Sequence, residues 1–299
     1  MMFDKSKVQL GFIGIGTMGG KMVRFLLADG YSVLIHDADR KKLDAIALEG
    51  GKIASSNKEV VDSCDVVLTS LPLSEIWVDV AEKDFVPNAR PGQVFIDMGT
   101  VTPLETRRIY AELKKKKAHL IDSPVSNAGG GNNKFYLFIG GDDEAISDNW
   151  PIFETLGVPD HRIRCGRTGS GQVVKGINQL GIGLINAAAL EIVAFGCRSG
   201  VDPDTFGRAV GVKGEVGWRG IIYKMAQDAA SGKVAGTPVK QGQLTHYLKE
   251  ATANGFDMPM TRALYEFLKD SPHTIQDANR KSPSYWNELI TRNYPEETE

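Results

Sequence analysis

The feature that most constrains the fold of this sequence is a short glycine pattern, Gly14-x-Gly16-x-x-Gly19. An apolar stretch at 8–13, typical of a buried strand, precedes it, and apolar residues at helical spacing over 18–28 follow it. In this strand–turn–helix context the first glycine permits a tight turn. The second lets the backbone approach a ligand, and the third lets helix and strand pack closely. The pattern therefore predicts an anion-binding turn at a helix N-terminus.

The spacing of the next acidic residue extends this interpretation to a dinucleotide. Asp37 stands 18 residues after Gly19, at the end of a predicted strand at 31–36. An acid about 20 residues beyond the glycines hydrogen-bonds the adenosine ribose and disfavours a 2′-phosphate, so we expect NAD in preference to NADP. Arg40 is close enough to pair with such a phosphate, which leaves NADP open. Asp37 can alternatively be a turn residue. The predicted cofactor loop comprises Gly14, Ile15, Gly16, Thr17, Met18 and Gly19.

Strand and helix signals alternate through the first half of the chain. The strands are expected at 8–13, 31–36, 66–70, 94–97, 119–122 and 137–140, with helices such as 18–28 and 40–49 between them. Such alternation with short connections predicts a mostly parallel sheet covered on both faces. The four lysines at 114–117 are interpreted as a solvated helix end.

Strand signals nearly vanish from Gly169 onward. Helices are expected at 170–196, 203–210, 220–230, 241–254, 259–268 and 284–292, and the first has apolar residues on all sides, which predicts that it is largely buried. The predicted fold is an α/β N-terminal Rossmann domain with a doubly wound, mostly parallel sheet, residues 1–167. An all-α C-terminal domain, residues 168–299, follows it through a long interdomain helix.

Composition excludes several functional classes. The 299 residues include 35 Lys and Arg against 37 Asp and Glu, a net charge of −2 that does not favour nucleic acid. Three scattered cysteines and five histidines show no disulfide or metal-ligand spacing, so no metal is expected. The N-terminal apolar run is broken by glycines and is not a signal peptide. We expect no membrane-spanning segment and a location in the cytoplasm or an organelle matrix.

The start of the long helix carries the residues that point to chemistry. Lys175, Asn178 and Gln179 are at positions i, i+3 and i+4, so they share one helix face. A lysine among buried neighbours loses hydration, which lowers its pKa and lets it exchange a proton with a hydroxyl. Asn178 would hold the amine and a substrate oxygen in register. The alternative is a lysine that extends to solvent and a structural asparagine.

Four stretches together resemble the β-hydroxyacid dehydrogenases, the family of 3-hydroxyisobutyrate dehydrogenase and tartronate semialdehyde reductase. They are the glycine loop, Ser70-Leu-Pro72 with Asp97-Met-Gly-Thr100, Asp122-Ser-Pro-Val-Ser126, and Gly169-Ser-Gly171 through Lys175 to Asn178. The resemblance implies interconversion of a small 3-hydroxy acid and its semialdehyde by hydride exchange with NAD(P). It also implies a homodimer or homotetramer formed through the helical domain.

The resemblance assigns roles to individual residues. It implies that Lys175 carries the proton with help from Asn178, and that Ser126 and the following backbone hold the substrate carboxylate. The cofactor cleft would be lined by Leu71, Pro72 and Thr100.

Three features depart from the family pattern, and one of them is a stretch up to Gly140-Gly141 that is about two residues shorter than in the family. Asn127 and Ala128 stand where the family usually has two glycines, so the usual substrates do not follow, and Asn127 would donate to a carboxylate or a bulkier anion such as a sulfonate. Many relatives have a Lys-Asp-Leu motif close to the cofactor, where this chain has Gly242-Gln243-Leu244. Lys240, two residues earlier, is the candidate substitute for the lysine of that motif. Trp218 either walls the substrate pocket or belongs to the helical core.

Other functions stay open at this point. One is a cofactor-binding scaffold that has lost catalysis, and another is a reductase for a sulfonate analogue or an imine. Imine reductases usually lack the lysine, and 6-phosphogluconate dehydrogenases have a longer helical domain.

Overall fold

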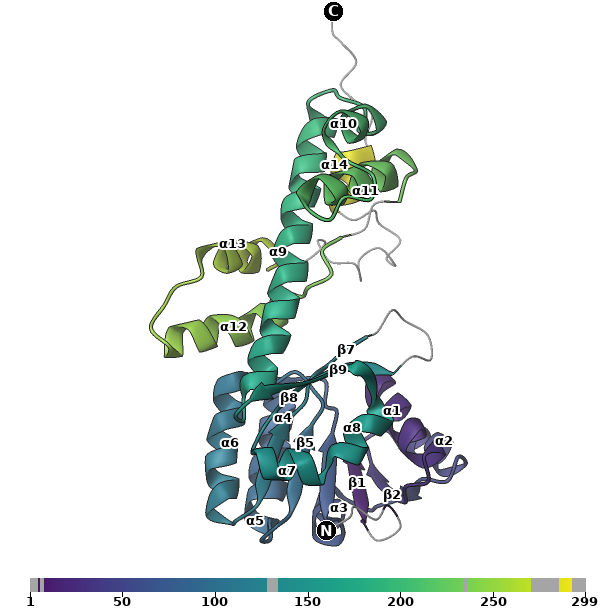
Figure 1. Cartoon of the computed structure of the whole chain (residues 1–299), viewed down its shortest axis with the longest axis vertical. Helices are drawn as coiled ribbons and strands as arrows, with labels where there is room; N and C mark the ends of the chain where they lie inside the picture. The colour runs from purple at the N-terminus through teal and green to yellow at the C-terminus, as the bar shows by residue number, and fades with distance from the viewer. Residues whose placement is uncertain (1–4, 6–7, 128–133, 234–235, 270–284, 292–299) are drawn as a thin grey trace, which may run out of the picture. The chain divides into compact units, whose positions relative to one another are not determined.

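The structure of the chain is a computed structural model that describes residues 5, 8–127, 134–233, 236–269 and 285–291. The chain divides into two compact units, Met1–Gly176 and Ile177–Glu299 (Figure 1). The limit predicted at residue 167 lies just before the helix that runs from one unit into the other. A separate substrate or oligomerisation role for the second part stays a prediction.

The described strands of the first unit form one sheet with the order β3-β2-β1-β4-β5-β6-β8-β7, and β9 pairs with β8. Strands from β3 to β6 are parallel, whereas β8 runs antiparallel to β6 and β7. The predicted mostly parallel sheet is confirmed. Its strands are β1 (Leu10–Ile13), β2 (Val33–His36), β3 (Lys52–Ile53), β4 (Val66–Thr69), β5 (Val94–Asp97), β6 (His119–Asp122), β7 (Val125–Asn127), β8 (Phe135–Gly140) and β9 (Gly157–Gly166).

Cross-strand pairing places one row of residues at the carboxyl ends of five parallel strands. The row runs through His36, Ile13, Thr69, Asp97 and Asp122. Adjacent strands lie about 4.8 Å apart, so the end of β4 is roughly 10 Å from the end of β6. The strand order reverses between β1 and β4, and ligands bind open α/β sheets at such a point.

Helices cover both faces of the sheet. Apolar residues of α1, α2, α7 and α8 pack on one face, and those of α3, α4 and α6 pack on the other. Side-chain caps start two of them, since Asp39 accepts from the Lys41 N–H and Ser56 accepts from the Glu59 N–H. The helices are α1 (Thr17–Ala28), α2 (Arg40–Ala47), α3 (Asn57–Ser63), α4 (Ser74–Val80), the π-helical turn η1 (Ala81–Phe85), α5 (Val86–Asn88), α6 (Pro103–Lys115), α7 (Asp143–Asp148) and α8 (Trp150–Leu156).

The described part of the second unit is built from helices around two apolar clusters, as the predicted all-α region requires. One cluster gathers α9, α11 and α14, and the other gathers α12 and α13 with a middle segment of α9. The helices are α9 (Ser170–Arg198), α10 (Pro203–Val210), α11 (Trp218–Ala230), α12 (Gln241–Ala253), α13 (Pro259–Phe267) and α14 (Tyr285–Thr291).

Helix α9 corrects two expectations. An 18-residue window within it has a mean hydropathy of 1.9, so it is long and apolar enough to span a membrane, contrary to the prediction that no segment is. A core helix of a soluble protein can pass the same test. Only 33% of that window is buried, so the prediction of a largely buried helix is wrong for this chain alone. The clusters cover one side, and Phe195 on the other is 73% exposed.

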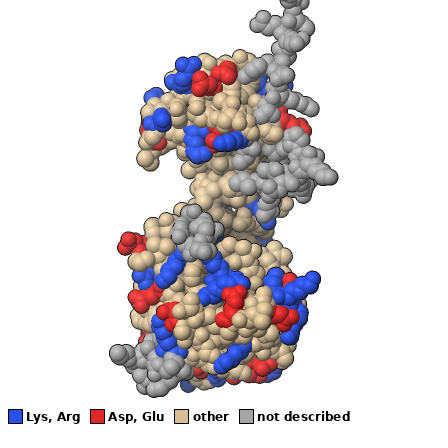
Figure 2. Space-filling model, turned by 90° about the vertical axis from the view of Figure 1, so that its right-hand side faces the viewer, with Lys and Arg blue, Asp and Glu red and all other residues tan. Residues whose placement is uncertain are grey.

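The face of the molecule seen in Figure 2 carries acidic and basic side chains close together on each unit. Several ion pairs of the described residues lie one helical turn apart, such as Lys58 with Asp62 and Arg208 with Asp204. Exposed pairs of this kind add little to stability.

Candidate functional site

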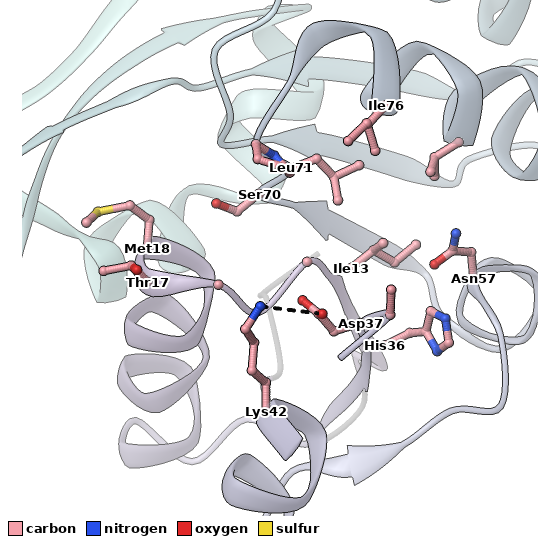
Figure 3. A pocket seen from close by; sticks show the side chains of 15 residues that line it. Ile13, Thr17, Met18, His36, Asp37, Lys42, Asn57, Ser70, Leu71 and Ile76 are labelled. Carbon is pink, nitrogen blue, oxygen red and sulfur yellow. Dashed lines mark ion pairs between the residues drawn. The ribbon is translucent and has the colours of Figure 1, made fainter. Parts of the chain in front are cut away.

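A cavity of about 500 Å³ opens at the point where the strand order reverses. Its walls come from the carboxyl ends of β1, β2 and β4, from the starts of α1, α2 and α3, and from α4 (Figure 3). Among its lining residues are Gly14, Gly16, Thr17, Met18, Asp37, Lys42, Leu71 and Pro72. Most of the predicted cofactor loop therefore lines one cavity.

The three glycines of the loop meet three different requirements. Gly14 has a φ of 87°, a left-handed conformation that other residues rarely adopt. A Cβ on Gly19 would overlap the carbonyl oxygen of Gly14, so this position needs glycine for α1 to meet β1. A Cβ on Gly16 would meet no protein atom within 4 Å. Gly16 is therefore free of packing demands, which leaves its backbone open to a ligand.

The start of α1 fits the pyrophosphate of a dinucleotide. Gly16 is the N-cap residue and supplies no side-chain cap, and the first turn carries no acidic residue. Backbone N–H groups of the first turn lack helical acceptors, and the helix dipole adds positive potential there. The residues present therefore fit a dinucleotide with its anionic group at this turn.

Asp37 holds the glycine loop and lines the cavity. Its Oδ2 accepts the Ile15 N–H at 2.8 Å, and its Oδ1 accepts the Asp39 N–H at 2.8 Å. The bond from the Asp39 N–H is a turn contact, so Asp37 acts as a turn residue and also lines the cavity. Lys42 Nζ lies 3.9 Å from Asp37 Oδ1, as the dashed line in Figure 3 marks.

The basic residue that lines this cavity is Lys42, and sequence analysis did not identify it. Arg40, the residue expected there, pairs with Asp44 at 2.9 Å and lines a more open hollow beside the cavity. The two side chains differ because Arg40 is the first residue of α2 and Lys42 is the third, and these two positions of a helix point in different directions.

Farther along the same sheet edge, two buried carboxylates join β5 and β6 to α9. Asp122 accepts the Gly169 N–H at 2.6 Å and the Gln172 N–H at 2.8 Å. Asp97 accepts the Thr69 hydroxyl at 2.8 Å and the Gln172 side-chain amide at 3.1 Å. Burial raises the pKa of both carboxyl groups, and the hydrogen bonds from Thr69 to Asp97 and from the Gly169 and Gln172 N–H groups to Asp122 oppose that shift by favouring the charged form.

Lys175 lies on the second turn of α9 and is only 8% exposed. Its Nζ donates to the Val125 carbonyl at 2.8 Å, just beyond the end of β6. Burial lowers the pKa of this amine to about 8, because the charged form loses hydration. An amine with such a pKa can both accept and donate a proton near neutral pH.

Asn178 and Gln179 follow one turn later on the same helix, and both are half-buried. The Nδ2 atom of Asn178 is buried and has no hydrogen-bond partner among the described residues. A buried donor without a protein partner is uncommon, and a water molecule or a ligand can accept its hydrogen bond.

The other predicted site residues have different surroundings. Ser126 is half-buried on β7, and Asn127 ends that strand opposite Phe135. Ala128 lies outside the described residues. Thr100 follows β5 and is not among the residues that line the cavity. Trp218 begins α11 and is 61% exposed, which contradicts the alternative that it is a core residue.

Lys240 is exposed at the start of α12, where its N–H donates to the Gln243 side chain. Among the described residues, no three His, Cys, Asp or Glu side chains converge as metal ligands, and the three cysteines are unpaired.

Known proteins match this chain in both sequence and fold. The family model described as the NAD binding domain of 6-phosphogluconate dehydrogenase matches residues 9–168, more than half of the chain. A probable 3-hydroxyisobutyrate dehydrogenase-like 2, mitochondrial, from Arabidopsis thaliana is 34% identical over 206 residues, which cover 68% of each chain. An NAD-dependent L-serine dehydrogenase from Pseudomonas aeruginosa is 25% identical over 286 residues, 90% of this chain and 95% of that protein.

A solved structure of Mycobacterium tuberculosis 3-hydroxyisobutyrate dehydrogenase with L-serine has a TM-score of 0.75 at 21% identity. The match covers 95% of this chain and 98% of that one, and at this identity it supports the fold alone. The matched first half is an NAD(P)-binding domain. On these matches the chain belongs to the β-hydroxyacid dehydrogenases, a family of NAD(P)-dependent oxidoreductases.

Proposed function

We propose that this protein interconverts a small 3-hydroxy acid and its semialdehyde, with Lys175 as the proton donor and acceptor. The observation that carries the proposal is a buried amine whose pKa is lowered to about 8 at the edge of the sheet that holds the glycine-rich cavity. Lys175 donates a hydrogen bond to the carbonyl of Val125, which is three residues after the end of β6. Strand β4, whose carboxyl end borders the cavity, is two strands away from β6 in the sheet.

Each chain residue has a defined part in this chemistry. When bound, the nicotinamide supplies the hydride acceptor or donor. In oxidation, the neutral Nζ of Lys175 accepts the hydroxyl proton of the substrate, and in reduction the charged Nζ returns a proton to the carbonyl oxygen. Asn178 donates its buried Nδ2–H to the substrate oxygen, which satisfies an otherwise unpaired donor. Gln179 and Trp218 complete the substrate contacts.

The acidic end of the substrate is assigned to β7 and the residues after it. Ser126 and Asn127 would donate hydrogen bonds to a carboxylate, and the Ala128 backbone would contribute beside them. Because Asn127 replaces a family glycine, a sulfonate in place of the carboxylate is part of the proposal. Candidate substrates are therefore 3-hydroxyisobutyrate, L-serine and 2-hydroxyethane-1-sulfonate.

NAD is the proposed cofactor because Asp37 presents a carboxylate to the cavity. Leu71 and Pro72 contribute an apolar wall, while Thr100 and Lys240 would contact the cofactor from elsewhere in the chain. A homodimer or homotetramer through the helical region and a cytoplasmic or matrix location complete the proposal.

Replacing Lys175 by alanine tests the function. The Lys175→Ala variant should lose roughly 10²–10⁴-fold in kcat with its best substrate, because general acid–base catalysis contributes that much. Its NADH affinity, measured by fluorescence titration, should be unchanged because the amine does not line the cavity.

Leu48→Ala, an exposed change on the far end of α2, is the matched control and should keep wild-type turnover. Wild-type turnover by Lys175→Ala would contradict the assigned role. A native protein that binds NADH but turns over no member of the substrate panel would favour a non-catalytic scaffold.

A further inference from the structure

We propose that Asp122 is a positioning residue for Lys175, because its carboxylate fastens the first turn of α9 to the end of β6. The inference rests on the proposed function, since it explains what holds the Lys175 amine in place. Asp122 itself touches no reacting atom in this account. All of the residues involved belong to the first compact unit.

The contact of Asp122 with α9 is a helix cap supplied from a distant strand. Helix α9 begins at Ser170, and the residue before it is Gly169, which has no side chain with which to cap the helix. The two oxygens of Asp122 accept the Gly169 N–H at 2.6 Å and the Gln172 N–H at 2.8 Å. A carboxylate in this place satisfies unpaired N–H groups and interacts favourably with the helix dipole.

The same short segment holds Lys175 at a second point. Two residues, Ser123 and Pro124, separate Asp122 from Val125, whose carbonyl accepts the Lys175 ammonium at 2.8 Å. Lys175 is three residues beyond Gln172, about one helical turn. The segment therefore contacts α9 at two successive turns, and the cap fixes how far the amine reaches along it.

Close packing leaves the helix start no room to shift. A Cβ on Gly171 would overlap the Phe138 carbonyl oxygen and lie 2.6 Å from that of Asp122. A Cβ on Gly140 would lie 2.7 Å from Asp122 Oδ1. The carboxylate is thus enclosed by β8 and by α9, and it has 0% exposure.

A second buried contact supports the first. The Gln172 side-chain amide donates to Asp97 and to the Gly99 carbonyl, and its oxygen accepts the Val101 N–H at 3.1 Å. Gln172 is therefore fixed by its backbone to β6 and by its side chain to the loop after β5. Both contacts align the turn that precedes Lys175.

The test replaces Asp122 by asparagine and follows the Lys175 amine directly. Asparagine has nearly the same shape, but its NH₂ group would face one of the two N–H donors, so one capping bond is lost. Competitive acetylation with acetic anhydride across pH, read by mass spectrometry, gives the reactivity and the pKa of Lys175 without any substrate. Turnover and NADH affinity are measured in parallel.

Positioning and direct charge interaction predict opposite signs for the pKa of Lys175. If the helix start loosens, the amine gains water, and its pKa rises by roughly half a unit to one unit toward its ordinary value. If Asp122 acted only through its negative charge, its removal would lower the pKa of the amine. Positioning also predicts at least a tenfold loss of kcat by Asp122→Asn, since small misplacements cost about that much or more.

Ser123→Ala is the matched control. Ser123 is the next residue along the segment and is equally buried, but its hydroxyl has no partner among the described residues. This variant should leave Lys175 labelling and kcat unchanged. NADH affinity should be unchanged in both variants.

A higher pKa and faster labelling of Lys175 in Asp122→Asn, with neither in Ser123→Ala, would support the inference. Unchanged labelling in Asp122→Asn would overturn it, even if Lys175→Ala remains inactive. An active Lys175→Ala variant would instead overturn the proposed function, while the labelling result would still report on the cap.

Hydrogen exchange of the native protein keeps the inference testable if Asp122→Asn does not fold. The Gly169 and Gln172 amides should exchange as slowly as those of β6, because a buried carboxylate holds them. Exchange at the rate of a frayed helix end would overturn the inference.

Discussion

Two lysines near the sheet edge show how surroundings decide what one residue type can do. Lys42 is partly exposed and lies 3.5 Å from Asp39 and 3.9 Å from Asp37, so its charge is balanced by carboxylates. Lys175 is buried against a carbonyl, and burial lowers its pKa to about 8. The first lysine suits an anion at the cavity, and the second suits proton exchange.

We expect Asp37 and Lys42 together to determine the choice between NAD and NADP. Asp37→Asn keeps an oxygen for the Ile15 N–H but removes the charge that repels a 2′-phosphate, which leaves Lys42 facing it. The ratio of NADPH to NADH affinity should rise roughly tenfold to a hundredfold, the equivalent of one charge-assisted hydrogen bond. Fluorescence titration with both nucleotides measures it.

The double variant Asp37→Asn with Lys42→Ala is the control and should lose most of that gain. An unchanged ratio in Asp37→Asn would show that this carboxylate does not select the cofactor.

Spacing in the sequence predicted some of these residues and not others. Helical periodicity put Lys175 and Asn178 on one face, and strand-to-acid spacing picked out Asp37. The contacts of Asp122 with Gly169 and Gln172 join residues 47 and 50 positions apart, and no local pattern reports such pairing. Lys42 was missed for a local reason, because the exact first residue of α2 decides which basic side chain faces the cavity.

At the scale of elements, two glycines of the turn before α1 are required for different reasons: Gly19 for packing and Gly16 for cofactor binding. Gly19→Ala places a Cβ against the Gly14 carbonyl, so the variant should be destabilised by a few kcal/mol. Gly16→Ala places its Cβ in open space, so thermal stability should be retained while NADH affinity falls at least tenfold. Thermal melts and NADH titrations on both variants check this.

Tight NADH binding by Gly16→Ala would contradict the placement of the pyrophosphate at this turn. Gly181→Ala, a change in α9 that also meets nothing within 4 Å, is the control and should keep wild-type NADH affinity.

The strongly apolar strands were predictable, whereas the polar and short ones were not. Each of β1, β4 and β5 is buried along its whole length, and the first three residues of each are apolar or glycine. Strand β9 was missed because most of its residues are exposed and its sequence has no regular apolar pattern, and its pairing with β8 fixes it instead. Strand β3 has two residues and gives no pattern to read.

For the whole molecule, the exposed side of α9 is the feature that a single chain leaves unexplained. Ile177, Ile185, Ile192 and Phe195 lie within about 80° of one another around the helix axis. The sequence showed that apolar residues surround this helix but not that one side would lack a partner within the chain. Large exposed apolar areas usually mark contacts with another molecule, which fits the proposed assembly.

Ile185→Glu should weaken that assembly, because it places a charge within the apolar face where Ile185 is 54% exposed in the single chain. Sedimentation velocity should show a shift toward monomer. Leu48→Glu, at a position 91% exposed just after α2, should not change the assembly. Identical sedimentation of wild type and Ile185→Glu would contradict an interface through this side of α9.

The pH dependence of the reaction in both directions tests the central role of Lys175 most directly. Burial lowers the pKa of this amine to about 8. Oxidation of the best hydroxy acid should therefore rise as pH increases through about 8, because only the neutral amine accepts the proton. Reduction of the matching semialdehyde should fall over the same range, because only the charged amine donates. Initial rates that are flat through this range in both directions, or that change with the same sign, would contradict the account.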